Sequence, residues 1–367
     1  MEALNRAEFA PFGTPGRVVP RRRLEVALAL LIAVVALGTF WSQQRYPALL
    51  KKLHAGTSVK VAGSISFDAL LPVKPAMPLP TRVMRTSVNW LYTNRFGMYF
   101  AIPFGAAMMT LLGSMAGPRR FRSAVANVAC GAMAGAPLGV CTNCATPVAQ
   151  SLLAGGASTR MTLAAMISSP SFNPVVIAMT FVLFPLPLAA LRMAVPAILL
   201  LLLPVLVKEN LPKTLGIEMP SFEPPVAIRV RRFLVAYGSN LLRLAWMTLP
   251  WMLLAAVLGA LAAETIPVYG THLPVSILGI VGVAVLGTLL PVPMALDVAL
   301  SYVLYHAGVP MPYVAALLCT LGAVSVYSLS AMAKQLDRNT AFRLAGAVAS
   351  LGTVAGLVML GLGSRQG

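Results

Sequence analysis

Long apolar segments alternate with short segments rich in Lys and Arg along most of this chain. A helix needs about 20 predominantly apolar residues to cross the hydrocarbon core of a bilayer, and most of these segments are long enough. Of the 367 residues, 58% are hydrophobic and 10% are charged, whereas a soluble domain carries about 25% charged residues. The sequence therefore predicts an all-α polytopic membrane protein.

Basic residues outnumber acidic residues, with 28 Lys and Arg against 10 Asp and Glu. In a soluble protein such a balance would suggest nucleic-acid binding. Here the basic residues cluster at the ends of apolar segments, as they do on the cytoplasmic side of membrane proteins. We therefore expect the lipid bilayer, and no nucleic acid, as a partner. We also expect a multi-pass protein of a bacterial cytoplasmic (inner) membrane, with its N-terminus on the cytoplasmic side.

The apolar segments and their flanks divide the chain into six predicted parts. Three arginines precede the first apolar segment and no small-residue cleavage site follows it, so this segment is predicted to be an uncleaved span. The parts are a cytoplasmic tail (1–23), an N-terminal transmembrane helix (24–41), an extracytoplasmic or periplasmic loop (42–96), a first transmembrane repeat (97–207), a cytoplasmic linker with an interfacial helix (208–243) and a second transmembrane repeat (244–363).

Each repeat contains one apolar stretch that is long and broken in its middle. Residues 123–154 are broken by Pro137 and Gly139, and residues 274–306 by a pair of prolines that ends at Pro293. The two patterns are separated by roughly 152 residues. Counting spans places the two copies in opposite orientations, so we expect an inverted-topology repeat with two broken or re-entrant helical hairpins, plus an extra N-terminal span.

Other segments are each predicted to form a single unbroken helix. An amphipathic pattern predicts an interfacial helix over 229–243, before a span over 244–263. A single span is predicted over 311–332. Arg192 and Arg243 lie near predicted span ends, where a long basic side chain can extend to the interface.

The break of the first hairpin carries two cysteines, Cys141 and Cys144. At this spacing their thiols lie on one side of a turn, close enough to share a soft ion or to form a disulfide. A helix that begins near Ala145 would direct its N-terminal amides at this turn and favour an anionic group there. The alternative is that two small side chains merely pack a tight turn. A structural zinc is disfavoured, because two cysteines are half of a tetrahedral set.

Polar residues accompany the cysteines. Asn143 lies between them, and Ser169 and Asn173 each precede a proline in the next apolar segment. Proline breaks the helical hydrogen-bond pattern and frees backbone carbonyls, which need partners at membrane depth. These side chains are expected to line a polar cavity with the cysteine turn, or to cap the broken helix, and both roles can hold together.

Asp297 is the one acid placed well inside a predicted membrane segment. A carboxylate inside a membrane is costly, and by default it suggests a functional role. We consider Asp297 a proton-coupling candidate, with the capping of a half-helix as the alternative.

At these residues the chain resembles a known family. The motifs are Gly139-Val-Cys141-Thr-Asn-Cys144-Ala-Thr-Pro147, Gly155-Gly156-Ala157 and Ser169-Pro170-Ser-Phe-Asn173-Pro174. They resemble the signature of the predicted-permease family that includes the bacterial methylarsenite (organoarsenical) efflux permeases. The resemblance covers roughly 270 residues from the second apolar segment onward. It implies a permease of the cytoplasmic membrane, in a family most of whose members have no assigned substrate.

The cysteine motif departs from that of the arsenical members. Those permeases carry Cys-Ser-Cys-Gly before the proline. Counting back from Pro147, Cys141 matches their first cysteine, Asn143 stands in the place of the second, and Cys144 in the place of the glycine. The motif Cys-Thr-Asn-Cys is thus compatible with the family but leaves the substrate open.

The function we expect is that of a permease or secondary transporter, with efflux as one option, and not of an enzyme. The solute would be a small molecule or ion that is thiophilic, such as a metalloid, a soft metal complex or a sulfur compound. No Walker A pattern or Rossmann fingerprint occurs, so no cofactor is expected. A homodimer is one option for its assembly. The expected substrate-binding residues are Cys141, Asn143, Cys144, Ser169 and Asn173, with Cys141 and Cys144 as ligands if the solute is a soft metal ion.

Two other functions remain open. The cysteine pair could act as the redox couple of a transmembrane thiol–disulfide electron carrier. The chain could instead be a membrane subunit of a larger complex that docks through loop 42–96.

Overall fold

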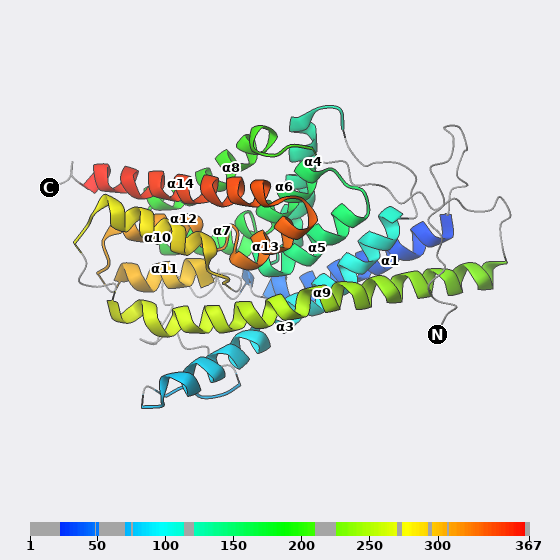
Figure 1. The fold of residues 1–367 in the computed structure, drawn as a ribbon, viewed down its shortest axis with the longest axis horizontal. Helices are drawn as coiled ribbons and strands as arrows, with labels where there is room; N and C mark the ends of the chain where they lie inside the picture. Colours follow the sequence, from blue (N-terminus) through cyan, green and yellow to red (C-terminus); the bar gives the residue numbers. More distant parts are fainter. Residues whose placement is uncertain are drawn as a thin grey trace.

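The structure, a computed structural model, describes residues 23–47, 49–50, 70–74, 76–113, 121–209, 225–269, 274–292, 296–306 and 308–363. Within these ranges every regular element is a helix (Figure 1). Five helices there are long and apolar enough to cross a membrane, by length and composition: Leu24–Arg45, Arg95–Leu112, Leu186–Leu206, Val226–Leu258 and Arg338–Leu362. The helices Thr159–Ser171 and Pro174–Leu183, which are bent by 44°, would together make a sixth.

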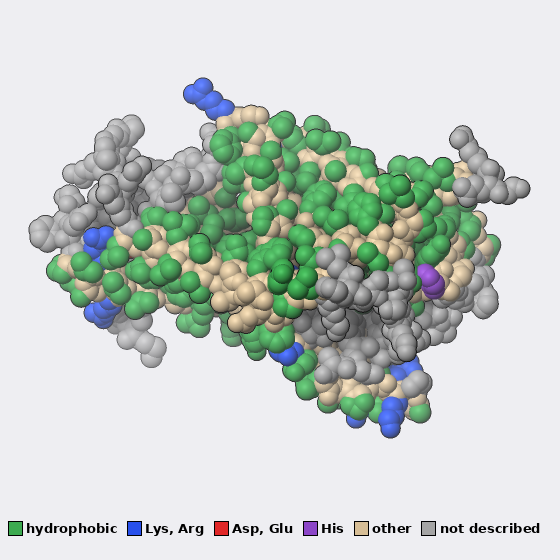
Figure 2. Space-filling view, turned by 180° about the vertical axis from the view of Figure 1, so that it is seen from behind, with side chains coloured by type: hydrophobic (Ala, Val, Ile, Leu, Met, Phe, Trp, Pro, Cys, Tyr) green, Lys and Arg blue, Asp and Glu red, His purple; other side chains and the backbone are tan. Residues whose placement is uncertain are grey.

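The surface fits the same interpretation. Figure 2 shows apolar side chains over the middle of one face, with Lys and Arg at its margins. A large apolar surface of this kind is costly in water and favourable against lipid. The predicted all-α polytopic membrane protein is confirmed.

Long helices enclose short ones (Figure 1). Helix α3 packs along α9, α8 packs against α14, and the short helices lie between these pairs. The long helices are α1 (Arg23–Phe40), α3 (Leu79–Gly113), α8 (Leu186–Leu206), α9 (Val226–Tyr269) and α14 (Arg338–Gly363). The short ones are α4 (Ala124–Gly135), α5 (Thr142–Ala154), α6 (Thr159–Ser171), α7 (Pro174–Leu183), α10 (Ile277–Leu289), α11 (Leu296–His306), α12 (Met311–Thr320) and α13 (Val326–Gln335).

Helices in the two halves begin at matching positions. Helix α6 begins at residue 159 and α12 at 311, α7 at 174 and α13 at 326, and α8 at 186 and α14 at 338, each pair 152 residues apart. The preceding turns match too, because Gly156 and Gly308 have φ angles of 86° and 83°. Packing is also reciprocal, since α5 contacts α13 and α7 contacts α11. These bounds agree with the expected offset, while the opposite orientation of the copies in a membrane stays a prediction.

Two helices are longer than the sequence pattern predicted. The interfacial helix expected over 229–243 is not separate, because it continues into the next span as α9. The loop expected over 42–96 ends earlier, because α3 begins at Leu79. Pro80 lies in the first turn of α3, where its missing N–H has no helical partner to lose. Residues 51–69 of this loop lie outside the described ranges.

The span predicted over 311–332 is instead two helices, α12 and α13. Between them Gly322 has a φ angle of 80°, a conformation that a residue with a Cβ rarely adopts. Ser325 then caps α13 in a reciprocal pair of hydrogen bonds with Ser328. No proline marks this break, and therefore apolar length alone predicted one continuous helix.

Candidate functional site

The thiol turn, residues 139–144, lies at the break of the first hairpin. A short η2 helix (Ala136–Leu138) follows α4, and Gly139 ends it with a φ angle of 58°. Cys141 is the N-cap of α5, and its Sγ accepts a hydrogen bond from the Cys144 N–H at 3.4 Å. Helix α5 therefore begins at Thr142, three residues before the predicted start.

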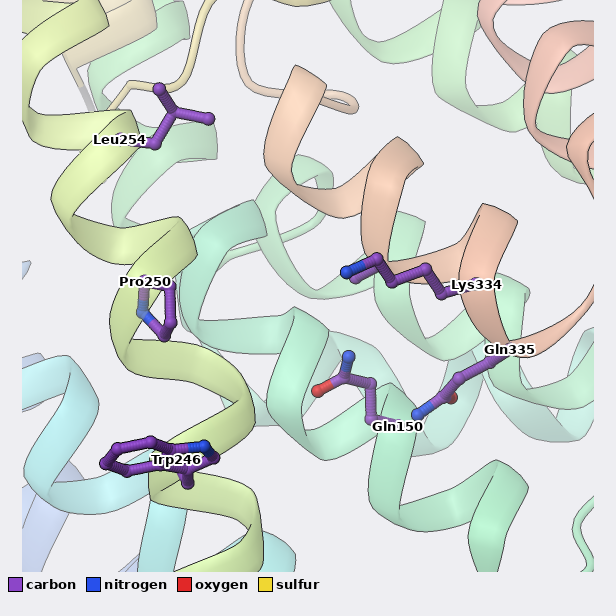
Figure 3. A pocket seen from close by; sticks show the side chains of 7 residues that line it. Gln150, Trp246, Pro250, Leu254, Lys334 and Gln335 are labelled. Atoms are coloured by element: carbon purple, nitrogen blue, oxygen red, sulfur yellow. The ribbon is translucent and has the colours of Figure 1, made fainter.

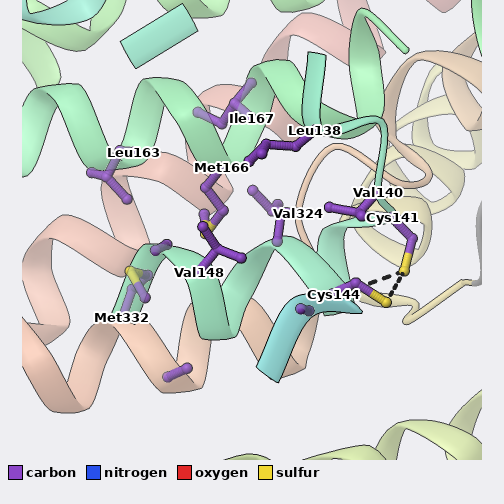
Figure 4. Close-up of a cluster of buried hydrophobic side chains, with 14 of the residues drawn as sticks. Leu138, Val140, Cys141, Cys144, Val148, Leu163, Met166, Ile167, Val324 and Met332 are labelled. Atoms are coloured by element: carbon purple, nitrogen blue, oxygen red, sulfur yellow. Dashed lines mark hydrogen bonds between the residues drawn. The ribbon is translucent and has the colours of Figure 1, made fainter. Parts of the chain in front are cut away.

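The two thiols lie next to each other. Their Sγ atoms are 3.0 Å apart, and no disulfide joins them. Cys141 is 4% exposed and Cys144 is 1% exposed. Figure 4 shows the pair beside a cluster of apolar side chains that includes Val140 and Val324. On α3, Gly97 faces the pair, because a Cβ there would lie 2.7 Å from the Cys144 Sγ. The pair is thus reduced, buried and closely surrounded.

Ser169 and Asn173 hold the backbone of the thiol turn. The Val140 N–H donates to the Ser169 Oγ at 3.2 Å, and the Asn173 Nδ2 donates to the Gly139 carbonyl at 2.9 Å. Asn173 also caps α7, since its Oδ1 accepts from the Val175 N–H at 2.9 Å. Both side chains are fully buried. Their visible role is to satisfy backbone groups at the break, which a membrane interior requires.

Asn143 joins the thiol turn to the second half of the chain. Its Nδ2 donates to the Val292 carbonyl at 3.4 Å, at the break after α10. Its Oδ1 accepts a hydrogen bond from the Ser325 Oγ at 3.1 Å, at the start of α13. The neighbouring Thr142 hydroxyl donates to the Gly322 carbonyl. The first hairpin therefore meets the breaks of the second repeat through its own tip.

Asp297 forms a buried ion pair. It lies in the first turn of α11, and its Oδ2 is 2.7 Å from the Nη2 of Arg192 on α8. The Arg192 side chain is 1% exposed and that of Asp297 is 6% exposed. The prediction that Arg192 extends to the interface is wrong, because its charge is compensated inside the protein. Arg243 is exposed, as predicted.

The ion pair and the thiol turn are linked through one residue, Gly322. A Cβ at Gly322 would lie 3.3 Å from the Asp297 Oδ2, while the Gly322 carbonyl accepts from Thr142. The same short segment between α12 and α13 therefore contacts both groups.

The cationic side chain of Arg45 also lies at the thiol turn. It comes from a segment that the sequence pattern did not place near this turn. After α1, the η1 helix (Trp41–Arg45) lies against the break. The Trp41 Nε1 donates to the Pro137 carbonyl at 2.5 Å, and Arg45 is buried beside Gly139. The pairing spans 96 residues of chain, so no local pattern could have found it.

A pocket of about 390 Å³ opens farther along α5 (Figure 3). It lies between α5, α9 and α13, and Gln150 and Lys334 supply polar groups to it. The Gln150 Oε1 is buried and has no hydrogen-bond partner in the described part of the chain. Gln150 follows Cys144 by six residues on α5, about 9 Å along the axis. The volume is in the range of small-molecule sites.

The structure thus brings together five of the predicted residues, Cys141, Asn143, Cys144, Ser169 and Asn173, and places Asp297 one residue away through Gly322. Among the described residues, no group of three or more His, Cys, Asp or Glu could hold a metal ion. The two thiols would therefore need further ligands from the solute itself to bind a soft ion.

Comparison with known proteins finds one similar sequence of note. The chain is 29% identical to the UPF0718 protein YraQ of Escherichia coli over 245 residues, which cover 65% of this chain and 68% of that protein. That name assigns no activity. No protein-family model matches the chain, and no solved structure matches it.

Proposed function

We propose that this protein is a secondary transporter that moves a small thiophilic solute across a bacterial cytoplasmic membrane, and that Cys141 and Cys144 bind this solute. The observation that supports the proposal most is the thiol turn itself. Two thiols 3.0 Å apart, not joined by a disulfide, lie at the tip of a broken helix pair. That tip contacts the breaks of a second, matching set of helices.

The arrangement suits alternating access. Transporters built from inverted repeats bind the solute between discontinuous helices and move one repeat against the other. The reciprocal packing of α5 on α13 and α7 on α11 supports such a pseudo-twofold relation. The pocket beside Gln150 is a candidate vestibule on one side of the thiol turn. In this proposal the N-terminus is cytoplasmic.

Asp297 keeps its proposed role in proton coupling, with Arg192 added to it. In this proposal, proton uptake at Asp297 is coupled to a separation of α11 from α8, which carries Arg192. Because Gly322 lies beside Asp297 and accepts a hydrogen bond from Thr142, that separation would alter the contact of Gly322 with the thiol turn.

Removal of the thiol pair tests the proposal. Phenylarsine oxide is a suitable probe, because its arsenic binds two thiols and releases one water. Cys141→Ser/Cys144→Ser should weaken its binding to the purified protein at least tenfold, about 1.4 kcal/mol. It should also abolish any resistance to trivalent arsenicals that the parent confers on a sensitive host. Binding is measured by the shift of the unfolding midpoint, since a ligand that binds only the folded state raises it.

The matched control is Cys130→Ala/Cys319→Ala, which removes the same number of thiols outside the turn. This variant should bind and transport like the parent. If the variant without Cys141 and Cys144 also binds and transports like the parent, the thiols are not ligands and the proposal fails.

A thiol–disulfide electron carrier is the second candidate function, because the sulfur atoms need to approach by only about 1 Å to form a bond of about 2.05 Å. Trapping of a mixed disulfide with a thioredoxin-like partner through Cys141 or Cys144 would favour this function. The subunit hypothesis depends on loop 42–96, and residues 51–69 of it lie outside the described ranges.

A further inference from the structure

We propose that Arg45 is a third member of the thiol site and makes it select solutes that carry negative charge. The inference deepens the proposed function and rests on it. The ligand class is a small anion that contains a thiophilic atom. The N-terminal span would then supply part of the binding site, in addition to the two repeats.

Helix η1 places Arg45 over the thiol turn. Trp41 anchors η1 through its hydrogen bond to the Pro137 carbonyl. A Cβ at Gly139 would lie 3.6 Å from the Trp41 ring and 3.7 Å from the Arg45 Cδ and Nε. The glycine therefore leaves room for the arginine stem to lie against the backbone of the turn. Both side chains cover the break from the side of α1.

The Arg45 charge is buried, and within the described ranges it forms no ion pair with a carboxylate. The residue is 9% exposed, and its guanidinium lies over the Phe40 ring at 4.3 Å from the centroid. Its Nε is buried and has no hydrogen-bond partner among the described residues. Cys141 and Cys144 lie close enough to act on this charge. Contact with an aromatic ring offsets only part of the cost of burying a cation.

The sequence offers no acid nearby in the chain. No Asp or Glu occurs between Asp68 and Glu209, a stretch that contains the whole first hairpin. The N-terminal amides of α5 add positive potential of the same sign at this turn. Since the described residues around the turn supply a cation and no carboxylate, we expect the compensating negative charge to come from a thiolate or from the solute. A site of this kind favours an anion.

The test uses two thiol reagents of opposite charge and the same reactive group. These are 2-sulfonatoethyl methanethiosulfonate, an anion, and 2-(trimethylammonio)ethyl methanethiosulfonate, a cation. The full chain with Cys130→Ala/Cys319→Ala is purified in detergent, and the rates of modification of Cys141 and Cys144 are followed by mass. Both reagents attack the thiolate, so the ratio of their rates reports solute charge and cancels changes in thiolate population.

Arg45→Gln should lower the ratio of anionic to cationic rates at least tenfold, because a unit charge a few ångströms away acts strongly in a site that excludes water. Arg45→Lys should keep most of the ratio. Arg243→Gln, at an exposed arginine on α9, is the matched control and should leave the ratio unchanged.

Two results would overturn the inference. The first is an unchanged ratio in Arg45→Gln; if both rates fall equally there, Arg45 acts on the thiolate and does not select the solute. The second is that neither reagent reacts with the turn of the parent, which would exclude an accessible site. If Arg45→Gln leaves the ratio unchanged but the loss of Cys141 and Cys144 abolishes binding of phenylarsine oxide, this inference fails while the transporter proposal stands.

Discussion

Asp297→Asn should lower the free energy of unfolding by about 3–5 kcal/mol, the usual cost of removing one partner of a buried ion pair. The variant leaves the Arg192 guanidinium inside the protein without its counter-charge. The Nε and Nη1 of Arg192 are already buried without hydrogen-bond partners in the described part of the chain. The loss of the carboxylate charge opposite Nη2 therefore leaves the guanidinium charge uncompensated. Chemical unfolding of the purified protein in detergent measures the change.

The double variant Arg192→Gln/Asp297→Asn distinguishes a charge effect from a packing effect. Removal of both charges is often close to neutral, whereas removal of one is not. We expect the double variant to be more stable than either Asp297→Asn or Arg192→Gln alone. Additive losses in the double variant, or a change within about 0.5 kcal/mol for Asp297→Asn, would mean that the pair is not a compensated buried pair.

Asn143→Leu should cost about 2–4 kcal/mol, because it leaves two buried groups without their partners. These are the Val292 carbonyl and the Ser325 hydroxyl, each of which loses a hydrogen bond to Asn143, and an unsatisfied buried polar group costs about 1–3 kcal/mol. Transport should suffer more than stability, since this side chain joins the tip of α5 to both breaks of the second repeat. Unfolding and transport of the arsenical probe are measured on the same variant.

Asn240→Leu is the matched control for Asn143→Leu. Asn240 on α9 donates to the Thr110 hydroxyl on α3 at 3.0 Å, so it also joins two helices, away from the hairpin tips. It should reduce stability while the transport rate per folded molecule is kept. Equal effects of the two variants on transport would show that Asn143 acts only through stability.

Elements with strong local signals could be predicted from the sequence. The break at Gly139 and the cap at Asn173 were expected because proline and glycine interrupt an apolar stretch there. The offset of the repeat followed from the same signals. The break at Gly322 was missed, since one glycine inside an apolar run costs only about 1 kcal/mol and does not by itself end a helix.

Long-range contacts could not be predicted from local patterns. Arg192 was assigned to the interface from its distance to a span end, but its burial depends on Asp297, 105 residues later. One signal could have found the pair, since each is a lone charge inside an apolar segment and their charges are opposite. Arg45 offered no such signal. Its place over the thiol turn depends on how η1 packs against Pro137.

The most direct test of the transport proposal is the access of the thiol turn from the two sides of the membrane. The background is Cys130→Ala/Cys319→Ala, so that a membrane-impermeant maleimide reports only Cys141 and Cys144. Labelling is compared in right-side-out and inside-out vesicles. Alternating access predicts labelling from both sides, and protection by phenylarsine oxide on both. Labelling from one side only, with or without the probe, would contradict a path through the thiol turn.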